Sequence, residues 1–227
     1  QTTEHKLTVP STQEEIKYRP FLVKEEKVLL QAQEGGQSEM MDAVGDVVES
    51  CTFGAIKVNT LPSFDLEYIF LNIRSKAVGE KVTLNLPFPG DEDVKVPTKI
   101  DLSKVEVHVD EEHTNKIDLT DQVSVVMRYP TIKTFSGIKV DKLTAEDAVD
   151  MTSRCIYQVV NGVETFEAAD LSKEEKQEFI ENLTQDQFAK IQKFFTTMPK
   201  LSHTVTLTHP KTKKKAKYKL EGMQSFF

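Results

Sequence analysis

The stretch "LPSFDLEYIFLNIRSKAVGEKVTLNLPF", from Leu61 to Phe88, changes its hydrophobic period partway along. Up to Gly79, apolar residues recur at the spacing of one helix face, which predicts an amphipathic helix that ends at the glycine. The residues expected to be buried on this face are Leu66, Ile69, Phe70 and Ile73. After Gly79, apolar and polar residues alternate, which predicts a β-strand with one buried face. The chain is therefore expected to be α+β.

The same two periods divide the rest of the chain into blocks. Helices are predicted over 24–35, 38–51 and 145–160, and two more open at Ser172 and Thr184; hairpins or short strands are predicted over 81–101, 105–130 and 203–220. We expect a helical N-terminal block, a central antiparallel strand block, and C-terminal helices followed by a β-hairpin. The predicted segments are an extended arm over 1–20, a helical block over 21–80, a β-rich block over 81–140, and a helical block with a C-terminal β-hairpin over 141–227. Together they are expected to form one or two compact units.

Composition limits the class of protein. The chain has 227 residues, 38% of them hydrophobic, which is enough for a buried core. No apolar run is long enough to span a membrane, and the first residues do not form a secretory signal. The two cysteines, Cys51 and Cys155, form no CxxC pair, so we expect buried free thiols in a reducing compartment. These features predict a soluble intracellular protein without a membrane partner.

Signatures of catalysis are absent from the sequence. It contains no GxGxxG, GxxxxGK[ST], HExxH or GxSxG motif. His108 and His113 flank three acids, a set of side chains that can bind a metal, but a solvated acidic turn is favoured. Cys155 is expected to be a buried thiol within a helix and not a nucleophile. We therefore predict no catalytic residue, no cofactor and no metal.

The charge is distributed unevenly. The net charge is −7, yet residues 200–220 hold seven lysines and no acid, so the remainder carries about −14. Lys213, Lys214 and Lys215 are the candidate partner-binding residues of this run. Three roles stay open: lysines that prevent edge-to-edge strand pairing, a surface for an acidic protein, or a surface for nucleic acid. The negative total and the lack of interleaved aromatic residues make nucleic acid the least favoured.

A second candidate lies in "KYRPFLVKEEKVLLQA", from Lys17 to Ala32. Pro20 fixes the chain just before the predicted helix, so Tyr18, Arg19 and Phe21 are held at its entrance. Aromatic rings and an arginine suit a partner's pocket and a partner's carboxylate, so these three residues are predicted to bind a partner through an exposed Arg19. The alternative is intramolecular: Glu25 or Glu26 pairs with Arg19 or Arg74, and the segment packs on the predicted helix over 64–74. Both roles can coexist.

Several blocks together resemble a known family. "YRPFLVKEEKVLLQA" from Tyr18, the Cys51-Thr52 pair and "LPSFDLEYIFLNIRSKAVGE" from Leu61 resemble the amino-terminal half of the baseplate hub assembly proteins of T-even-type contractile-tailed bacteriophages. The ending is similar too, in "FFTTMPKLSHTVTL" and "LEGMQSFF", so the resemblance spans about 17–227.

The resemblance implies a non-enzymatic tail morphogenesis protein, a hub subunit or chaperone that acts by protein–protein contact. It implies hub or other tail proteins as partners, in the cytoplasm of the infected host; a homo-oligomer and a place in the virion tail baseplate are left open. The alternative is a binding protein that uses the lysine-rich hairpin on nucleic acid or an acidic host partner. Family members with paired cysteines suggest zinc ribbons, but "LNLPFPG" and "LTHPKTK" contain no cysteine, so no zinc is expected here.

Overall fold

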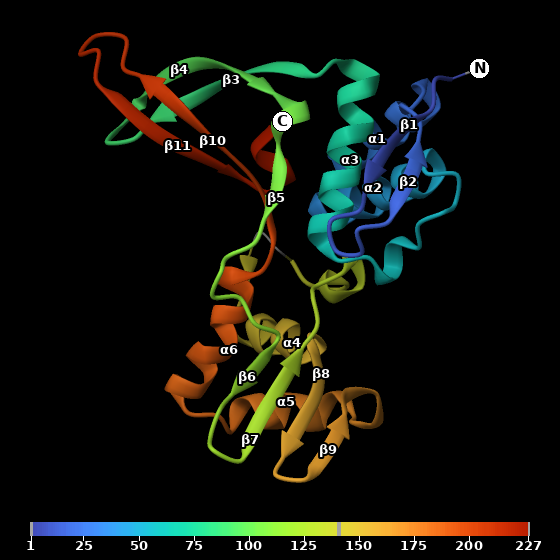
Figure 1. Cartoon of the computed structure of the whole chain (residues 1–227), viewed down its shortest axis with the longest axis vertical. Helices are drawn as coiled ribbons and strands as arrows, with labels where there is room; N and C mark the ends of the chain where they lie inside the picture. Colours follow the sequence, from blue (N-terminus) through green and yellow to red (C-terminus); the bar gives the residue numbers. More distant parts are fainter. Residues whose placement is uncertain (1, 140–141, 227) are drawn as a thin grey trace.

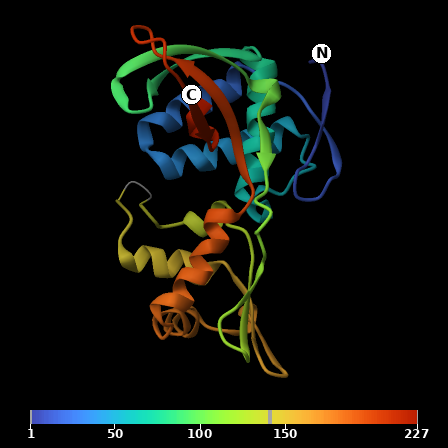
Figure 2. The ribbon, with the colours of Figure 1, turned by 60° about the vertical axis from the view of Figure 1, so that its left-hand side comes forward.

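The protein consists of two lobes stacked along its longest axis (Figure 1). The structure, a computed structural model, describes residues 2–139 and 142–226. It has an α+β fold, as the sequence predicts, with several separate antiparallel sheets. Each lobe has its own hydrophobic core, and the turned view shows the same separation (Figure 2). We call residues 2–109 with 200–226 the upper lobe and residues 110–199 the lower lobe.

The body of the upper lobe is helical. Its elements are β1 (His5–Thr8), β2 (Glu15–Tyr18), α1 (Val23–Gly35), α2 (Gln37–Cys51), η1 (Val58–Thr60) and α3 (Ser63–Val78). Helix α3 packs against α2, which also packs against α1, and the β1–β2 hairpin covers the same core. Helix α3 also contacts β5, β10 and η6, described below, which makes it the central element of the lobe.

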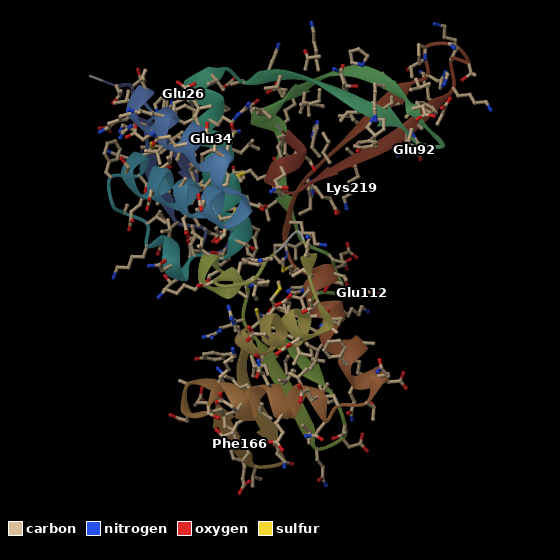
Figure 3. The ribbon with its side chains drawn as sticks, turned by 180° about the vertical axis from the view of Figure 1, so that it is seen from behind. Glu26, Glu34, Glu92, Glu112, Phe166 and Lys219 are labelled. Atoms are coloured by element: carbon tan, nitrogen blue, oxygen red, sulfur yellow. The ribbon has the colours of Figure 1, made fainter. Side chains whose placement is uncertain are left out.

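Two long hairpins project from this body as an arm (Figure 1). One consists of β3 (Lys81–Phe88) and β4 (Asp91–Asp101), and the other of β10 (Lys200–Thr208) and β11 (Lys215–Glu221). Their apolar faces turn toward each other and continue the upper core, because Leu86, Ile100, Leu207 and Leu220 are all buried in one cluster. The opposite faces are polar, and Glu92 and Lys219 both lie on this arm (Figure 3). We call this pair of hairpins the arm.

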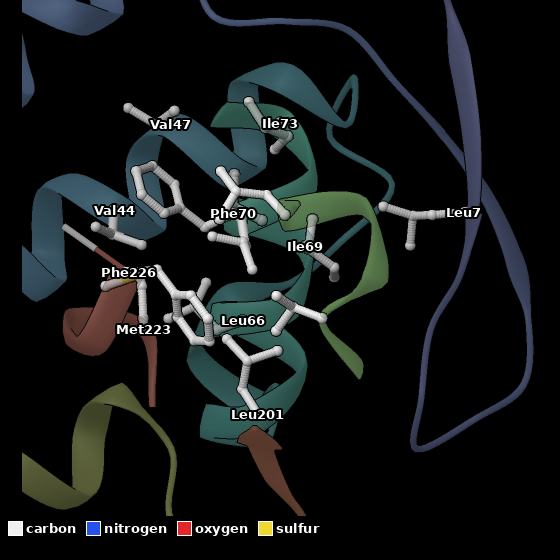
Figure 4. Close-up of a cluster of buried hydrophobic side chains, with 14 of the residues drawn as sticks. Leu7, Val44, Val47, Leu66, Ile69, Phe70, Ile73, Leu201, Met223 and Phe226 are labelled. Carbon is white, nitrogen blue, oxygen red and sulfur yellow. The ribbon is translucent and has the colours of Figure 1, made fainter. Parts of the chain in front are cut away.

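The upper core gathers residues from both ends of the described chain (Figure 4). The predicted face of α3 is buried: Leu66, Ile69 and Ile73 have no exposed surface and Phe70 has almost none. Leu7 reaches the core from β1, and Phe226 reaches it from the short helix η6 (Met223–Phe226). Burying such side chains stabilises the fold by about 1.5–3 kcal/mol each. The core is therefore incomplete without residues beyond 200.

The lower lobe packs helices against a four-stranded meander. The strands are β6 (Lys116–Asp118), β7 (Val123–Met127), β8 (Ile156–Asn161) and β9 (Glu164–Glu167), paired in that order. The helices are α4 (Ala145–Arg154), α5 (Lys173–Glu181) and α6 (Gln185–Thr197), with the short helices η3 (Ile132–Phe135) and η5 (Ala168–Asp170) beside them. Side chains such as Val125, Ile156, Ile191 and Phe194 form its core.

The lower lobe is inserted into the upper one. The chain leaves the upper lobe after η2 (Leu102–Lys104) and β5 (Glu106–His108) and returns through β10. Strands β5 and β10 are antiparallel neighbours, with Lys200 opposite His108 and Ser202 opposite Glu106. The exit and the return therefore lie side by side at the neck between the lobes (Figure 2).

The first segment differs from the extended arm that the sequence suggested. β1 and β2 pair in an antiparallel hairpin, and Leu7, Val9 and Tyr18 are buried. Pro10 excludes a helix, as we expected, but it lies in the loop between the strands, where it costs no ladder hydrogen bond. A proline-rich polar segment is thus compatible with a packed hairpin.

The helix predicted over 145–160 is shorter than expected. Thr144 caps it, since its hydroxyl accepts a hydrogen bond from the Asp147 amide, but the helix ends at Arg154. Residues 156–161 form β8 in the middle of the lower sheet. The prediction was wrong here because "IYQVV" carries β-branched residues that fit either a helix face or a buried strand over so short a run.

Candidate functional site

The structure places the Tyr18 to Phe21 segment inside the upper lobe. Tyr18 is 2% exposed and Arg19 is 9% exposed, while Phe21 is half-buried against the upper core. The Arg19 amide donates to the Cys51 carbonyl at the end of α2, with an N–O distance of 2.9 Å. The segment is therefore bound along its backbone as well as by its side chains.

The Arg19 guanidinium is the centre of a buried polar cluster. It forms an ion pair with Glu25 at 2.9 Å and donates to the Ser50 hydroxyl at 3.1 Å. Glu25 also accepts a hydrogen bond of 2.7 Å from the Leu22 amide at the start of α1. Burial alone would raise the pKa of Glu25, but the bonds from Arg19 and Leu22 outweigh it and lower this pKa to about 2.

Two roles were considered for Arg19, binding of a partner protein and an ion pair within the fold, and its contacts distinguish them. The expectation of an exposed arginine is wrong, because Arg19 ties the entrance of α1 to the end of α2. Glu25, and not Glu26, is its partner, so the intramolecular contacts exist. Binding of a tail protein by Tyr18, Arg19 and Phe21 stays a prediction, and only Phe21 has substantial surface for it.

The lysines of the arm lie on an open polar surface. On β11, Lys215, Lys217 and Lys219 are exposed and alternate with Ala216, Tyr218 and Leu220, which turn toward β3–β4. Thr208, Thr206 and Thr204 of β10 are their cross-strand neighbours. Three more exposed lysines, Lys211, Lys213 and Lys214, occupy the loop between the strands. Above Glu221 at its base, the outer face of this hairpin is thus formed by lysine and threonine, with no aromatic ring.

Most of these lysines have no acidic partner. Lys219 pairs with Glu221 at 2.8 Å. Within residues 2–139 and 142–226, no ion pair is formed by Lys211, Lys213, Lys214, Lys215 or Lys217. Their charges therefore remain available to a molecule in solution.

His209 organises the tip of the arm, a role that our reading of the sequence missed. Its Nδ1 accepts hydrogen bonds from the Lys211 and Thr212 amides, both at 3.1 Å. Because Nδ1 is an acceptor, Nε2 carries the proton and donates to Asp91 at 3.2 Å. The ring also contacts Phe88 edge-on, with centroids 5.0 Å apart. His209 therefore connects the lysine loop to the acidic start of β4. A histidine just before a proline at a hairpin turn was the available signal.

His113 lies within the lower lobe, where it supports a contact between the lobes and does not form a metal site. Its ring nitrogens lie 3.0 Å from the Thr197 and Tyr129 hydroxyl oxygens, and burial lowers its pKa. Tyr129 in turn meets Phe64 of α3 edge-on at 5.1 Å. His108 is exposed on β5. In the described part of the chain, no three His, Cys, Asp or Glu side chains are placed to hold a metal ion.

Both cysteines are buried free thiols, as predicted. Burial raises the pKa of Cys51 to about 11 and that of Cys155 to about 12, so neither is a thiolate at neutral pH. Cys155 caps the C-terminal end of α4 and does not lie within the helix. A nucleophilic role for either cysteine has no support in this geometry.

A cleft of about 550 Å³ opens at the junction of the lobes. It is lined by α2, α3, η3 and the segments next to β10 and β11. Glu67 of α3 lies in this cleft, and burial raises its pKa to about 7, although a hydrogen bond from the Met223 amide opposes the shift. Sequence reasoning did not identify Glu67, since on a helical pattern it is one acid among many.

Comparison with known proteins gives one match. No curated protein and no solved structure matches the chain. None of the helices among the described residues is both long and apolar enough to cross a membrane. The model of one family, the T4 bacteriophage base plate protein, matches residues 2–227. The chain therefore belongs to the T4 bacteriophage base plate protein family.

Proposed function

We propose that this protein is a non-enzymatic component of the central hub of a phage tail baseplate, and that it works by contact with other tail proteins during hub assembly. The family match over residues 2–227 carries the proposal, because it makes the chain a baseplate protein. The hub is the part of the baseplate that the blocks at Tyr18 and Leu61 suggest by resemblance.

The form of the molecule supports a role in binding. The arm extends two long hairpins away from the helical body, which gives the small protein a far-reaching surface (Figure 1). The surroundings of the two cysteines give no support for catalysis through them, because both thiols are buried and protonated.

The test is deletion of the gene from a phage that encodes the protein. We expect lysates of the deletion phage to lack complete baseplates, and purified intermediates to lack the central hub when viewed by electron microscopy. Antibody detection in purified wild-type tails then separates a resident subunit from an assembly factor that leaves. Complete baseplates in the deletion lysate would refute the hub role.

A further inference from the structure

The chain builds the same hairpin twice, once at each end. Residues 7–18 read "LTVPSTQEEIKY" and residues 207–218 read "LTHPKTKKKAKY", with six of twelve positions identical at a constant offset of 200. The first copy is β1–β2 and the second is β10–β11. Leu7 pairs with Ile16 and Leu207 with Ala216, so the strand registers also correspond.

The loops of the two hairpins have one geometry. The Val9 amide donates to the Glu14 carbonyl at 2.9 Å, and the His209 amide donates to the Lys214 carbonyl at 2.8 Å. The fifth loop residue has a positive φ in both, 59° at Gln13 and 60° at Lys213. The preceding threonine accepts a hydrogen bond from the residue two positions on, at 3.3 Å in the first loop and 3.5 Å in the second.

The two copies also bury the same face. Leu7 and Leu207 are buried, as are Val9 and His209. They differ on the exposed side. The first hairpin has Ser11, Gln13, Glu14 and Glu15 where the second has Lys211, Lys213, Lys214 and Lys215. We call these four lysines the lysine turn.

The first hairpin is thus an internal control for the second. Its outer face is neutralised by cross-strand pairs, with Lys6 bonded to Glu15 at 2.8 Å and Glu4 3.7 Å from Lys17. It folds and remains a two-stranded sheet without a cluster of lysines. The lysine turn is therefore required neither for the loop geometry nor for protection of the strand edges, and a structural role does not account for it.

We propose that the lysine turn binds a protein surface rich in aspartate and glutamate. The lysine turn has no acidic partner in the described chain, so carboxylates from another protein would complete it. On a protein surface, aspartate and glutamate can lie opposite the lysines. Uncharged residues of the same partner can then cover Thr206 and Thr208, which share this face of the hairpin. The binding of an acidic protein surface does not depend on the proposed function. Only the identity of that partner, another tail protein, rests on it.

Nucleic acid fits the same surface less well. The contact of His209 with Asp91 puts the start of β4, with Asp91, Glu92 and Asp93, next to the lysine turn. A nucleic acid bound to the arm would continue its phosphate backbone past the lysine turn onto these acids, whereas a folded protein can place its carboxylates over the lysine turn alone. Tyr218, the aromatic residue of this hairpin, faces β3–β4 and offers no ring for base stacking.

The test exchanges the lysine turn for the residues of the first hairpin: Lys211→Ser, Lys213→Gln, Lys214→Glu and Lys215→Glu in the full chain. The melting temperature should stay within about 2 °C, because the first hairpin builds the same loop from these residues. The matched control replaces Lys81, Lys95 and Lys99, exposed on β3 and β4, with glutamate. Both variants lower the net charge by six units on the same arm.

The probes are labelled polyglutamate and single-stranded and duplex DNA of similar charge, measured by fluorescence anisotropy at about 0.15 M salt. We expect the wild type to bind polyglutamate more tightly than either DNA, the exchange to weaken that binding at least about tenfold, and the control to change it less than about threefold. Equal binding by wild type and exchange variant would overturn the proposal. If the wild type binds DNA more tightly than polyglutamate, the surface is assigned to nucleic acid. If the wild type self-associates in a salt-sensitive way and the exchange variant does not, the surface is assigned to a second copy of the chain. Either result overturns the inference.

The outcome is separable from that of the proposed function. If the deletion phage builds complete hubs, the hub role fails while the polyglutamate result stands. If the deletion blocks the hub but the exchange changes neither polyglutamate binding nor complementation, only the lysine-turn inference fails.

Discussion

Two carboxylates of the upper lobe are withdrawn from water, and their surroundings shift their pKa values in opposite directions. Glu25 is bonded to Arg19 and to the Leu22 amide, and its pKa falls to about 2. Glu67 lies in the cleft between the lobes, and burial raises its pKa to about 7. Ionised Glu25 therefore stabilises the folded state, whereas Glu67 stabilises the folded state when its carboxyl is protonated.

Arg19→Ala should destabilise the protein by about 3–5 kcal/mol, because it removes the buried partner of Glu25 and leaves only Lys24, which is exposed and 3.7 Å away. The wild-type pair adds stability above the ordinary pKa of 4.5 that is lost as the pH falls toward 2, and the variant should lack this dependence. Urea unfolding at several pH values measures both effects. Lys17→Ala, at an exposed neighbour, should change stability by less than about 0.5 kcal/mol. A loss below about 1 kcal/mol for Arg19→Ala would mean that the cluster does not hold the helices together.

Glu67→Gln should flatten the pH dependence of stability near neutrality. The folded carboxyl keeps its proton up to about pH 7, whereas the unfolded one loses it near 4.5, so the wild type loses about 1–3 kcal/mol as the pH rises between these values. Glutamine cannot ionise and can still accept from the Met223 amide, so the variant should be more stable than the wild type at pH 8. Glu26→Gln on the exposed side of α1 is the control. An equal pH slope in wild type and Glu67→Gln would contradict the assignment.

At the scale of elements, the repeated hairpin shows one loop used in two settings. In the first copy Val9 packs into the upper core, and in the second His209 contacts Phe88 and binds Asp91. The imidazole supplies an acceptor to two loop amides that valine cannot supply. The second loop is thereby fixed beside β3–β4 and not on the helical body.

His209→Val, the residue of the first hairpin, should loosen the tip without unfolding the lobe. The Lys211 and Thr212 amides lose their acceptor, so their hydrogen exchange should accelerate about tenfold, at a global cost of about 1–2 kcal/mol. NMR-detected exchange measures the local effect and urea unfolding the global one. Asp91→Asn is the matched control, because an amide oxygen still accepts from Nε2. Unchanged exchange at both amides would show that His209 does not order the loop.

Periodicity over long segments allowed the helices around the cores to be predicted, and α3 with its buried face is the clearest case. It failed at β8, where a short β-branched run fits two periods. Hydrophobic periodicity does not reveal the repeated hairpin, because the residues that its two copies share include Pro10, Thr12 and Tyr18 with Pro210, Thr212 and Tyr218, which are mostly loop positions. For Arg19, the pattern showed an arginine at a helix entrance but not the α2 residues that cover it.

On the scale of the whole molecule, the insertion of one lobe into the other could not be read from the sequence. It depends on β5 pairing with β10 across the entire lower lobe, and no local pattern encodes such a partner. The linear blocks of the sequence therefore do not coincide with the hydrophobic cores. Residues before 106 and after 200 form the upper core together.

A chain in which a two-residue Asn-Gly turn replaces 109–199 should keep the fold of the upper lobe. His108 and Lys200 are paired across the ladder, so a short turn joins them without strain. Stability should fall, since Ile132 of η3 no longer packs on the upper core. Circular dichroism and thermal unfolding test this. The removed segment, 109–199, should fold by itself around Phe194. A non-cooperative transition in the shortened chain would show that the upper lobe needs its insert.

The nesting of the lobes also sets an order of events during synthesis. The lower core is complete once Phe194 has left the ribosome, whereas the upper core still lacks Leu201, Leu207, Leu220, Met223 and Phe226. Domains usually mature from the N-terminus onward. Here the part begun first is expected to finish last, because the apolar faces of α1, α2 and α3 stay partly exposed on the nascent chain until residues 201–226 have emerged.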